Sequence, residues 1–324
     1  MEEPLPSTCR AIGAALLVAF ALAGPPAQAE TVAVFTKSQG SPIFAALRSG
    51  ATAAARSLGV EVIHYVPSTA DSVVEQNKLV DDAIKDKPAA IVFDPVDFNK
   101  ASGAVDKINA AGIPLFNVNE RLRAGSIAGY VGIDDVALAL ATGRYLIKAM
   151  NGNGAVVILD GPDGNRTAQG RFQGFRDAVK EAPGVKLLAG KSANYARSSG
   201  QQVTADLLRS FAQIDGILAA NDPMAIGAVD ALKAAKRKSM VVGINASREA
   251  MELIKSGDIL GSGDYDSFAM GCLALEMAVR SLRKEEVPKE VMLKPVVIDK
   301  TNYAPFDQPL DKRECPTLKS VAGQ

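Results

Sequence analysis

The sequence is poor in the side chains that most often carry out catalysis or bind metal. It holds one histidine, His64, and three cysteines among 324 residues. His64 lies inside the apolar run 60–66 and is better explained as a strand residue, although any histidine-based triad would have to use it. Clustered cysteine and histidine ligands for zinc are absent. We therefore expect no catalytic residue, no metal site and no cofactor.

The chain also lacks an excess of charge of either sign. It has 36 basic and 36 acidic residues, and no block of lysine and arginine stands out. Proteins that bind nucleic acid or anionic membrane surfaces usually carry such blocks. The spacing G-x-G-x-x-G is missing after the first expected strand, where a nicotinamide cofactor would require it. These absences argue against nucleic-acid, membrane-surface and dinucleotide binding.

No apolar run reaches the roughly 20 residues that a membrane-spanning helix needs. The run 11–23 is shorter, and Ala27-Gln28-Ala29 follows it as a small-x-small cleavage site. Residues 1–29 therefore predict a signal peptide that is cleaved after Ala29. We expect the mature protein to be exported and soluble.

Two cysteines, Cys272 and Cys315, remain after this cleavage, because Cys9 lies within the signal peptide. An oxidising compartment would allow them to pair. However, Cys272 lies in a helical pattern beside Gly271 and Leu275, which favours a buried thiol that packs as a small apolar side chain. We expect the buried thiol and keep the disulfide as the alternative.

From Thr31 onward, short β-branched runs alternate with longer runs of helical period. The first series predicts strands and helices in turn at 31–35, 42–58, 60–66, 71–86, 89–93, 98–111 and 114–118. The second series predicts strands near 155–159, 185–189, 216–220, 240–244 and 259–263, with helices between them. Alternating strands and helices imply parallel sheets covered on both faces. The sequence thus predicts an α/β fold with two doubly wound, parallel-sheet lobes.

Polar residues follow four of the predicted strands, at the carboxyl ends where open parallel sheets bind ligands. They are Asp94, Asn119-Glu120-Arg121, Asn221-Asp222 and Asn245. Capping a helix is the better explanation for Asp222, and for Asp94 capping and binding are equally good. Carboxylates, amides and guanidinium groups can bridge neighbouring hydroxyls. Aromatic cover for such a ligand would come from Tyr195 and Phe44, although Phe44 could equally be a core residue.

Six segments together resemble a known family. They are Ser41-Pro42-Ile43-Phe44, Asp94-Pro95, Ala111-Gly112-Ile113-Pro114, Arg171-Phe172-Gln173-Gly174-Phe175, Ala220-Asn221-Asp222-Pro223-Met224-Ala225-Ile226-Gly227-Ala228 and Val241-Val242-Gly243-Ile244-Asn245. They resemble the ribose-binding-protein-like, type I branch of the periplasmic solute-binding proteins, which are the receptors of ABC sugar importers. The resemblance covers nearly all of the mature chain.

The resemblance implies a periplasmic, monomeric receptor that is not an enzyme. It would close two lobes around a monosaccharide or polyol and deliver this ligand to an ABC permease in the inner membrane. Three hinge crossings would join a lobe of residues 30–133 plus 266–293 to a lobe of 134–265 plus 294–299, with a tail at 300–324. The implied ligand-binding residues are Ser41, Ile43, Phe44, Asp94, Asn119 and Glu120 from the first lobe, and Arg171, Tyr195, Asn221, Asn245 and Tyr265 from the second.

The chain departs from the family at three of these positions. Pentose binders of the family often carry Asp-Arg where this chain has Asn119-Glu120, and Asp where it has Asn245. These changes make ribose doubtful and leave the choice among other monosaccharides, polyols and cyclitols open. Arg121 could replace the missing cation or could point to solvent.

Two other functions stay open on the sequence alone. A periplasmic sensor that reports its liganded state to a chemoreceptor or histidine kinase would have the same fold and pocket. An exported enzyme acting on sugars could use Asp94 and Glu120 as a carboxylate pair, although the rest of a recognisable site is absent. A cytoplasmic repressor is disfavoured, because a leader stands where a DNA-binding head would be needed.

Overall fold

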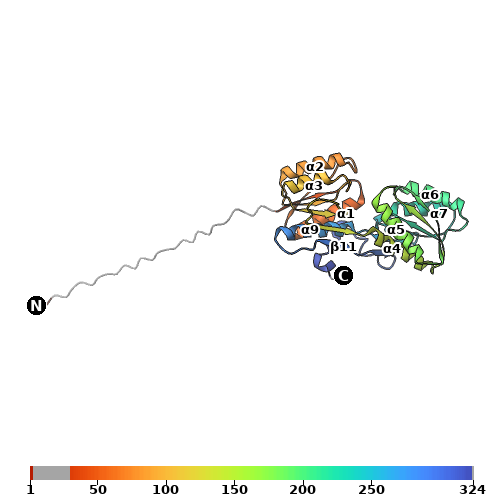
Figure 1. Cartoon of the computed structure of the whole chain (residues 1–324). Coiled ribbons are helices and arrows are strands. Elements are labelled where there is room, and N and C mark those ends of the chain that lie inside the picture. The colour runs from red at the N-terminus through yellow and green to blue at the C-terminus, as the bar shows by residue number, and fades with distance from the viewer. Residues whose placement is uncertain (3–29, 323–324) are drawn as a thin grey trace.

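The computed structural model describes residues 1–2 and 30–322, so the predicted signal peptide lies almost entirely outside the described residues. The described chain forms two lobes that lie side by side (Figure 1). Each lobe is built on its own six-stranded sheet with helices on both faces. Among the described residues, no helix combines the length and the apolar character that crossing a bilayer requires.

The sheet of the first lobe has the order β11-β5-β4-β3-β1-β2 and all its pairs are parallel. Its strands are β1 (Thr31–Phe35), β2 (Glu61–Tyr65), β3 (Ala90–Phe93), β4 (Leu115–Val118), β5 (Gly129–Ile133) and β11 (Glu290–Leu293). Its helices are α1 (Pro42–Leu58), α2 (Val73–Asp86), α3 (Ser102–Ala110) and α9 (Ser267–Leu282).

The central strands of this sheet are buried on both faces because the helices cover both. In β1, Val32 and Val34 join the core on the side of α1 and α9, whereas Ala33 and Phe35 join the core of α2 and α3. Successive side chains of a strand point to opposite faces. The continuous apolar run of β1 therefore fits a central strand rather than an edge.

The second lobe has a sheet of the order β12-β10-β9-β8-β6-β7. Its strands are β6 (Gly154–Asp160), β7 (Val185–Ser192), β8 (Gly216–Ala219), β9 (Met240–Ile244), β10 (Gly261–Asp264) and β12 (Val296–Asp299). Its helices are α4 (Asp135–Ala149), α5 (Arg166–Lys180), α6 (Arg197–Ser210), α7 (Asp222–Ala234) and α8 (Arg248–Ser256). Every pair is parallel except that of β10 with β12, which is antiparallel.

The backbone passes from one sheet to the other at three places. It leaves the first sheet after β5 to enter α4, returns after β10 to enter α9, and crosses again between β11 and β12. These connections are short: one residue separates β5 from α4, two separate β10 from α9, and two separate β11 from β12. Residues that follow β4, β8, β9 and β10 line cavities between the lobes, so the carboxyl ends of strands from both sheets border a common space.

The predicted α/β fold of two doubly wound lobes is confirmed. The predicted strands 31–35 and 240–244 and the predicted helix 42–58 match the observed bounds of β1, β9 and α1. Three strands, β5, β11 and β12, were not predicted. In β5, Gly129 and Gly132 obscured the strand pattern; a Cβ on Gly132 would lie 2.1 Å from the hydroxyl of Tyr130. The short strands β11 and β12 are edge strands on either side of Pro295.

The expectation of a free, buried thiol at Cys272 is wrong. Cys272 is buried, but it forms a disulfide with Cys315, and the two Cα atoms are 5.6 Å apart. Cys315 belongs to the C-terminal tail, residues 300–322 of the described chain, which contains the 3-10 helix η1 (Leu310–Lys312) and α10 (Leu318–Ala322). Local sequence patterns could not show that this irregular tail returns to α9.

Candidate functional site

The residues predicted to bind a ligand lie at the carboxyl ends of strands or in the loops that follow them. In the first lobe, Ser41 precedes α1, Asp94 follows β3, and Asn119 and Glu120 follow β4. In the second lobe, the corresponding positions follow β7, β8, β9 and β10 and belong to Tyr195, Asn221, Asn245 and Tyr265. Arg171 comes from within α5.

A buried carboxylate forms the centre of the cluster in the first lobe. Asp94 is fully buried, and Nδ2 of Asn119 lies 3.1 Å from each of its carboxylate oxygens. Burial raises the pKa of Asp94 to about 7, although the nearby charge of Lys37 opposes this shift. The carboxyl group is therefore able to accept or donate hydrogen bonds near neutral pH.

Lys37 supplies the positive charge of this cluster, and sequence reasoning missed it. Its Nζ lies 2.7 Å from Oε1 of Glu120 and 3.9 Å from Oδ1 of Asp94. Burial lowers the pKa of Lys37, but the charges of Asp94 and Glu120 outweigh burial and leave this pKa raised. The sequence position of Lys37 could have indicated this role, because Lys37 comes two residues after β1, at the same sheet edge as the predicted residues.

The loop after β4 is held by a buried amide. Asn117 donates to the carbonyl oxygens of Phe93 and Glu120 at 3.0 and 2.9 Å, and its Oδ1 accepts from the backbone N–H of Leu122 at 2.9 Å. Asn119 adopts a left-handed backbone conformation, with φ of 65°, which asparagine tolerates better than most residues. These contacts fix the direction of the Asn119 and Glu120 side chains.

A buried guanidinium organises the cluster in the second lobe. Nε of Arg171 lies 2.9 Å from Oδ1 of Asp135, and Nη1 donates to the carbonyl oxygen of Ala220 at 2.7 Å and to Oδ1 of Asn245 at 3.3 Å. Arg171 is only 3% exposed. Asp135 at the start of α4 was also missed, because an acidic residue there is usually explained by the helix dipole.

Tyr265 connects the two clusters. Its hydroxyl donates a 2.6 Å hydrogen bond to Oδ1 of Asn119. Its ring centroid lies 5.0 Å from the guanidinium carbon of Arg171. A continuous series of contacts thus runs from Lys37 in the first lobe through Asp94, Asn119 and Tyr265 to Arg171 in the second, and its last step is the cation–π contact.

Capping was the wrong explanation for Asp222 and does not apply to Asp94. The N-cap of α7 is Asn221, whose Oδ1 accepts from the N–H of Met224 at 3.0 Å. Asp222 is the first residue of the helix, and its carboxylate accepts instead from the Ser262 hydroxyl and the Ser247 N–H, each at 2.6 Å. Asp94 caps no helix, because α3 begins only at Ser102.

Arg121 lies at the cleft, where it lines the same cavity as Asn119 and Glu120, but its charge is already paired. It forms an ion pair with Glu290 of β11, and its guanidinium lies 4.1 Å from the ring centroid of Tyr130. Both side chains of the ion pair are more than two-fifths exposed. The cation nearest to Asp94 is Lys37.

Two cavities open between the lobes. One of about 710 Å³ is lined by Ser41, Ile43, Asn221 and Asn245 together with part of the tail. The other, of about 590 Å³, is lined by residues of both lobes that include Asn119, Glu120, Asp135 and Tyr265. Seven of the eleven predicted residues therefore line an inter-lobe cavity.

The other four predicted residues, Phe44, Asp94, Arg171 and Tyr195, line neither cavity. Asp94 and Arg171 are buried behind the residues that do. The Tyr195 hydroxyl is also buried and has no hydrogen-bond partner within the described part of the chain. The ring of Phe44 lies 5.9 Å from Nζ of Lys37. Asp94 and Arg171 are thus members of the polar cluster itself, and Phe44 lies beside it, next to Lys37.

The fold and this site agree with the comparisons to known proteins. The family model described as periplasmic binding protein domain matches residues 32–286. The D-apiose import binding protein of Paraburkholderia graminis is 31% identical over 301 residues, which cover 92% of this chain and 96% of the relative. The xylitol-binding protein of Mycolicibacterium smegmatis is 31% identical over 237 residues, or 72% of this chain and 68% of the relative.

A solved structure matches as well. It is a periplasmic solute binding protein of an ABC transporter from Actinobacillus succinogenes with bound D-allose. The TM-score is 0.78 at 31% sequence identity, and the match covers 84% of this chain and 98% of the other. The family suggested by the sequence motifs is confirmed, and the chain belongs to the periplasmic binding protein family.

Proposed function

We propose that this protein captures a neutral monosaccharide or polyol between its two lobes and delivers it, chemically unchanged, to an ABC import permease. The observation that carries this proposal is the series of contacts from Lys37 through Asp94, Asn119 and Tyr265 to Arg171. The series includes residues of both lobes, and it lies beside two inter-lobe cavities. A ligand that contacts both lobes favours the closed arrangement, because only there are all its contacts made.

The ligand chemistry follows from the groups that surround the cavities. Carboxylates and amides at Glu120, Asp135, Asn119 and Asn245 accept hydrogen bonds from hydroxyls, and the amides also donate. The buried cations Lys37 and Arg171 are already paired with carboxylates, so an anionic sugar would gain little from them. The relatives are named for, or hold, D-apiose, xylitol and D-allose. This supports a neutral, hydroxyl-rich ligand.

The remaining parts of the proposal concern the whole protein in its compartment. We assign residues 30–133 plus 266–293 to one lobe, 134–265 plus 294–299 to the other, and place the hinge at the three crossings. The mature protein would begin at Glu30 and act as a monomer in the periplasm. The disulfide Cys272–Cys315 supports an oxidising compartment. The docking partner would be the permease in the inner membrane.

A thermal-shift screen of the mature protein against neutral sugars, polyols and cyclitols tests the proposal. A ligand that binds only the folded state should raise the melting temperature, and calorimetry should then give one site per chain. Deleting the gene should abolish uptake of the radiolabelled ligand. Normal uptake with lost signalling would reject the transport role, and conversion of the bound sugar to a product would reject a purely binding role.

A further inference from the structure

The C-terminal tail begins on the second lobe. It follows β12, which pairs with β10 in the second sheet. Nζ of Lys255 in α8 lies 2.6 Å from Oδ2 of Asp307 in the tail. The same ammonium group is 5.5 Å from the ring centroid of Tyr303. The first part of the tail is therefore attached to α8 by a charged side chain.

The tail then crosses to the first lobe. The short helix η1 packs against α1. The guanidinium of Arg313 donates a 3.2 Å hydrogen bond to Oδ1 of Asp266, where the chain enters α9, and lies 5.0 Å from the ring centroid of Phe268. The crossing thus runs beside the second hinge connection.

The end of the tail is fixed to the first lobe by a covalent bond. Cys315 forms the disulfide with Cys272 in α9. After it, the N–H of Leu318 donates to Oε2 of Glu276 at 2.8 Å, and Leu318 is buried. The helix α10 packs against α9 and β11, and in Figure 1 this dark blue end of the tail lies beside β11. The tail is therefore attached more strongly to α9 than to α8.

The crossing part of the tail also forms a wall of the cleft. Tail residues from Phe306 to Asp311, with Arg313, line the cavity of about 710 Å³. The facing walls of the same cavity are α1, with Ser41 and Ile43, and the second lobe, with Asn221 and Asn245. If the cleft opens, α8 moves away from α9, and either the Lys255–Asp307 contact breaks or the tail leaves α9.

We propose that the C-terminal tail is a fourth connection between the lobes that restrains how far the cleft opens. We call residues 300–322 the strap. The Cys272–Cys315 disulfide fixes the strap to the first lobe, and the Lys255–Asp307 ion pair fixes it to the second. The inference goes beyond the proposed function, because it concerns the ligand-free protein and requires no particular ligand. Two conformations of one protein are often close in free energy, so a single contact is able to shift their populations.

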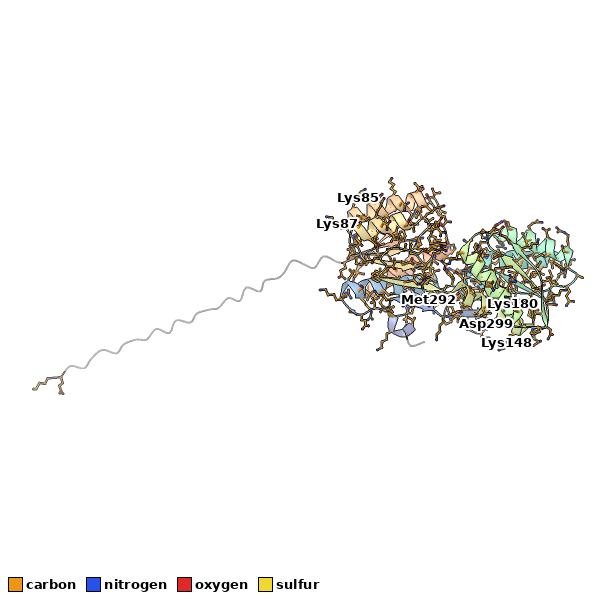
Figure 2. All side chains as sticks on the ribbon, viewed as in Figure 1. Lys85, Lys87, Lys148, Lys180, Met292 and Asp299 are labelled. Atoms are coloured by element: carbon orange, nitrogen blue, oxygen red, sulfur yellow. A yellow bond between two sulfur atoms is a disulfide. The ribbon has the colours of Figure 1, made fainter. Side chains whose placement is uncertain are left out.

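Distances between the lobes in the ligand-free mature protein test the strap. Spin labels would be placed by Lys85→Cys and Lys180→Cys, at exposed positions on the first and second lobes (Figure 2). Pulsed electron spin resonance then gives the distance distribution. Asp307→Asn should shift it to longer distances and raise the open population roughly two- to fivefold, as expected for loss of a partly exposed ion pair. Cys272→Ser/Cys315→Ser should shift it further.

Glu252→Gln is the matched control. Glu252 pairs with the same Lys255 at 2.9 Å, but from within α8 rather than from the tail, so its loss should leave the distances unchanged. Circular dichroism checks folding, and Asp307→Asn decides the matter if the double serine variant does not fold. Distributions of Asp307→Asn that overlay the wild type, or an equal shift in Glu252→Gln, would overturn the strap. Solute binding is measured separately in the thermal-shift screen, so failure of the strap would not contradict the proposed function.

Discussion

The hydroxyl of Tyr265 donates its hydrogen bond to Oδ1 of Asn119 at 2.6 Å, and this contact spans the boundary between the lobes. Tyr265 lies directly after β10, at the second crossing, whereas Asn119 follows β4 in the first sheet. The same Asn119 side chain donates to Asp94. The position of Tyr265 is therefore tied, through Asn119, to the buried carboxylate of the first lobe.

Tyr265→Phe should weaken ligand binding and lower the free energy of unfolding by about 0.5 to 1.5 kcal/mol, because Oδ1 of Asn119 loses the Tyr265 hydroxyl as a donor in a partly buried position. Calorimetry and urea denaturation measure the two effects. Tyr145→Phe is the control, since its hydroxyl donates to Oδ2 of Asp299 at 2.8 Å within the second lobe. It should lower stability by a similar amount and leave binding unchanged; equal loss of binding in both variants would contradict the role given to Tyr265.

Arg171→Ala and Asp94→Ala should each weaken ligand binding by more than about tenfold, or 1.4 kcal/mol. Removal of Arg171 leaves the buried carbonyl of Ala220 and the partly buried Asp135 without their hydrogen bonds, and removal of Asp94 does the same to the partly buried Asn119. Titration calorimetry with the ligand identified in the screen measures the change.

Arg176→Ala, an exposed position on the same helix as Arg171, is the matched control for this pair and should bind as the wild type does. Thermal melts must show that the variants are folded at the temperature of the titration. Wild-type affinity in both folded variants would mean that the ligand binds elsewhere.

Much of the site followed from one regularity of parallel sheets. Asp94, Asn119, Asn221 and Asn245 could be predicted because polar residues directly after apolar strands meet at a shared edge. Lys37 stands at that same edge, but a lysine after a strand is usually exposed, and only the three-dimensional contact with Asp94 and Glu120 explains its burial.

Pairing that depends on distant segments could not be predicted in this way. Arg171 binds Asp135 across 36 residues, and Cys272 meets Cys315 because the tail returns to α9. The strands β11 and β12 could not be predicted for a similar reason, because they are short edge strands whose pairing depends on tertiary packing. Local patterns carry information about strands and helices but not about which remote side chains they bring together.

Loss of the disulfide should destabilise the protein strongly. The bond closes a loop with a sequence separation of 43 residues, for which the chain-entropy model gives a stabilisation of about 4 kcal/mol. Cys272→Ser/Cys315→Ser should therefore unfold at a lower denaturant concentration than the oxidised wild type. Dithiothreitol should lower the midpoint of the wild type and have no effect on the variant; an unchanged midpoint in reduced wild type would show that the disulfide does not stabilise the fold.

The buried carboxyl of Asp94 should make stability depend on pH. Burial raises its pKa in the folded protein from 3.8 to about 7, so between these values the folded state holds a proton that the unfolded state has released. The contribution of Asp94 to the free energy of unfolding therefore falls as pH rises from about 4 to about 7, by up to about 1.4 kcal/mol per pH unit. Urea denaturation at several pH values measures it.

Asp94→Asn should remove this slope, because an amide neither releases nor binds the proton. Burial also raises the pKa of Asp222 to about 6, which adds a slope of the same sign, so the quantity to compare is the difference between the wild type and the variant. The free energy of unfolding of the wild type minus that of Asp94→Asn should therefore fall as the pH rises. A pH-independent difference for Asp94→Asn would mean that Asp94 is ionised in the folded protein throughout this range, with Lys37 outweighing the effect of burial.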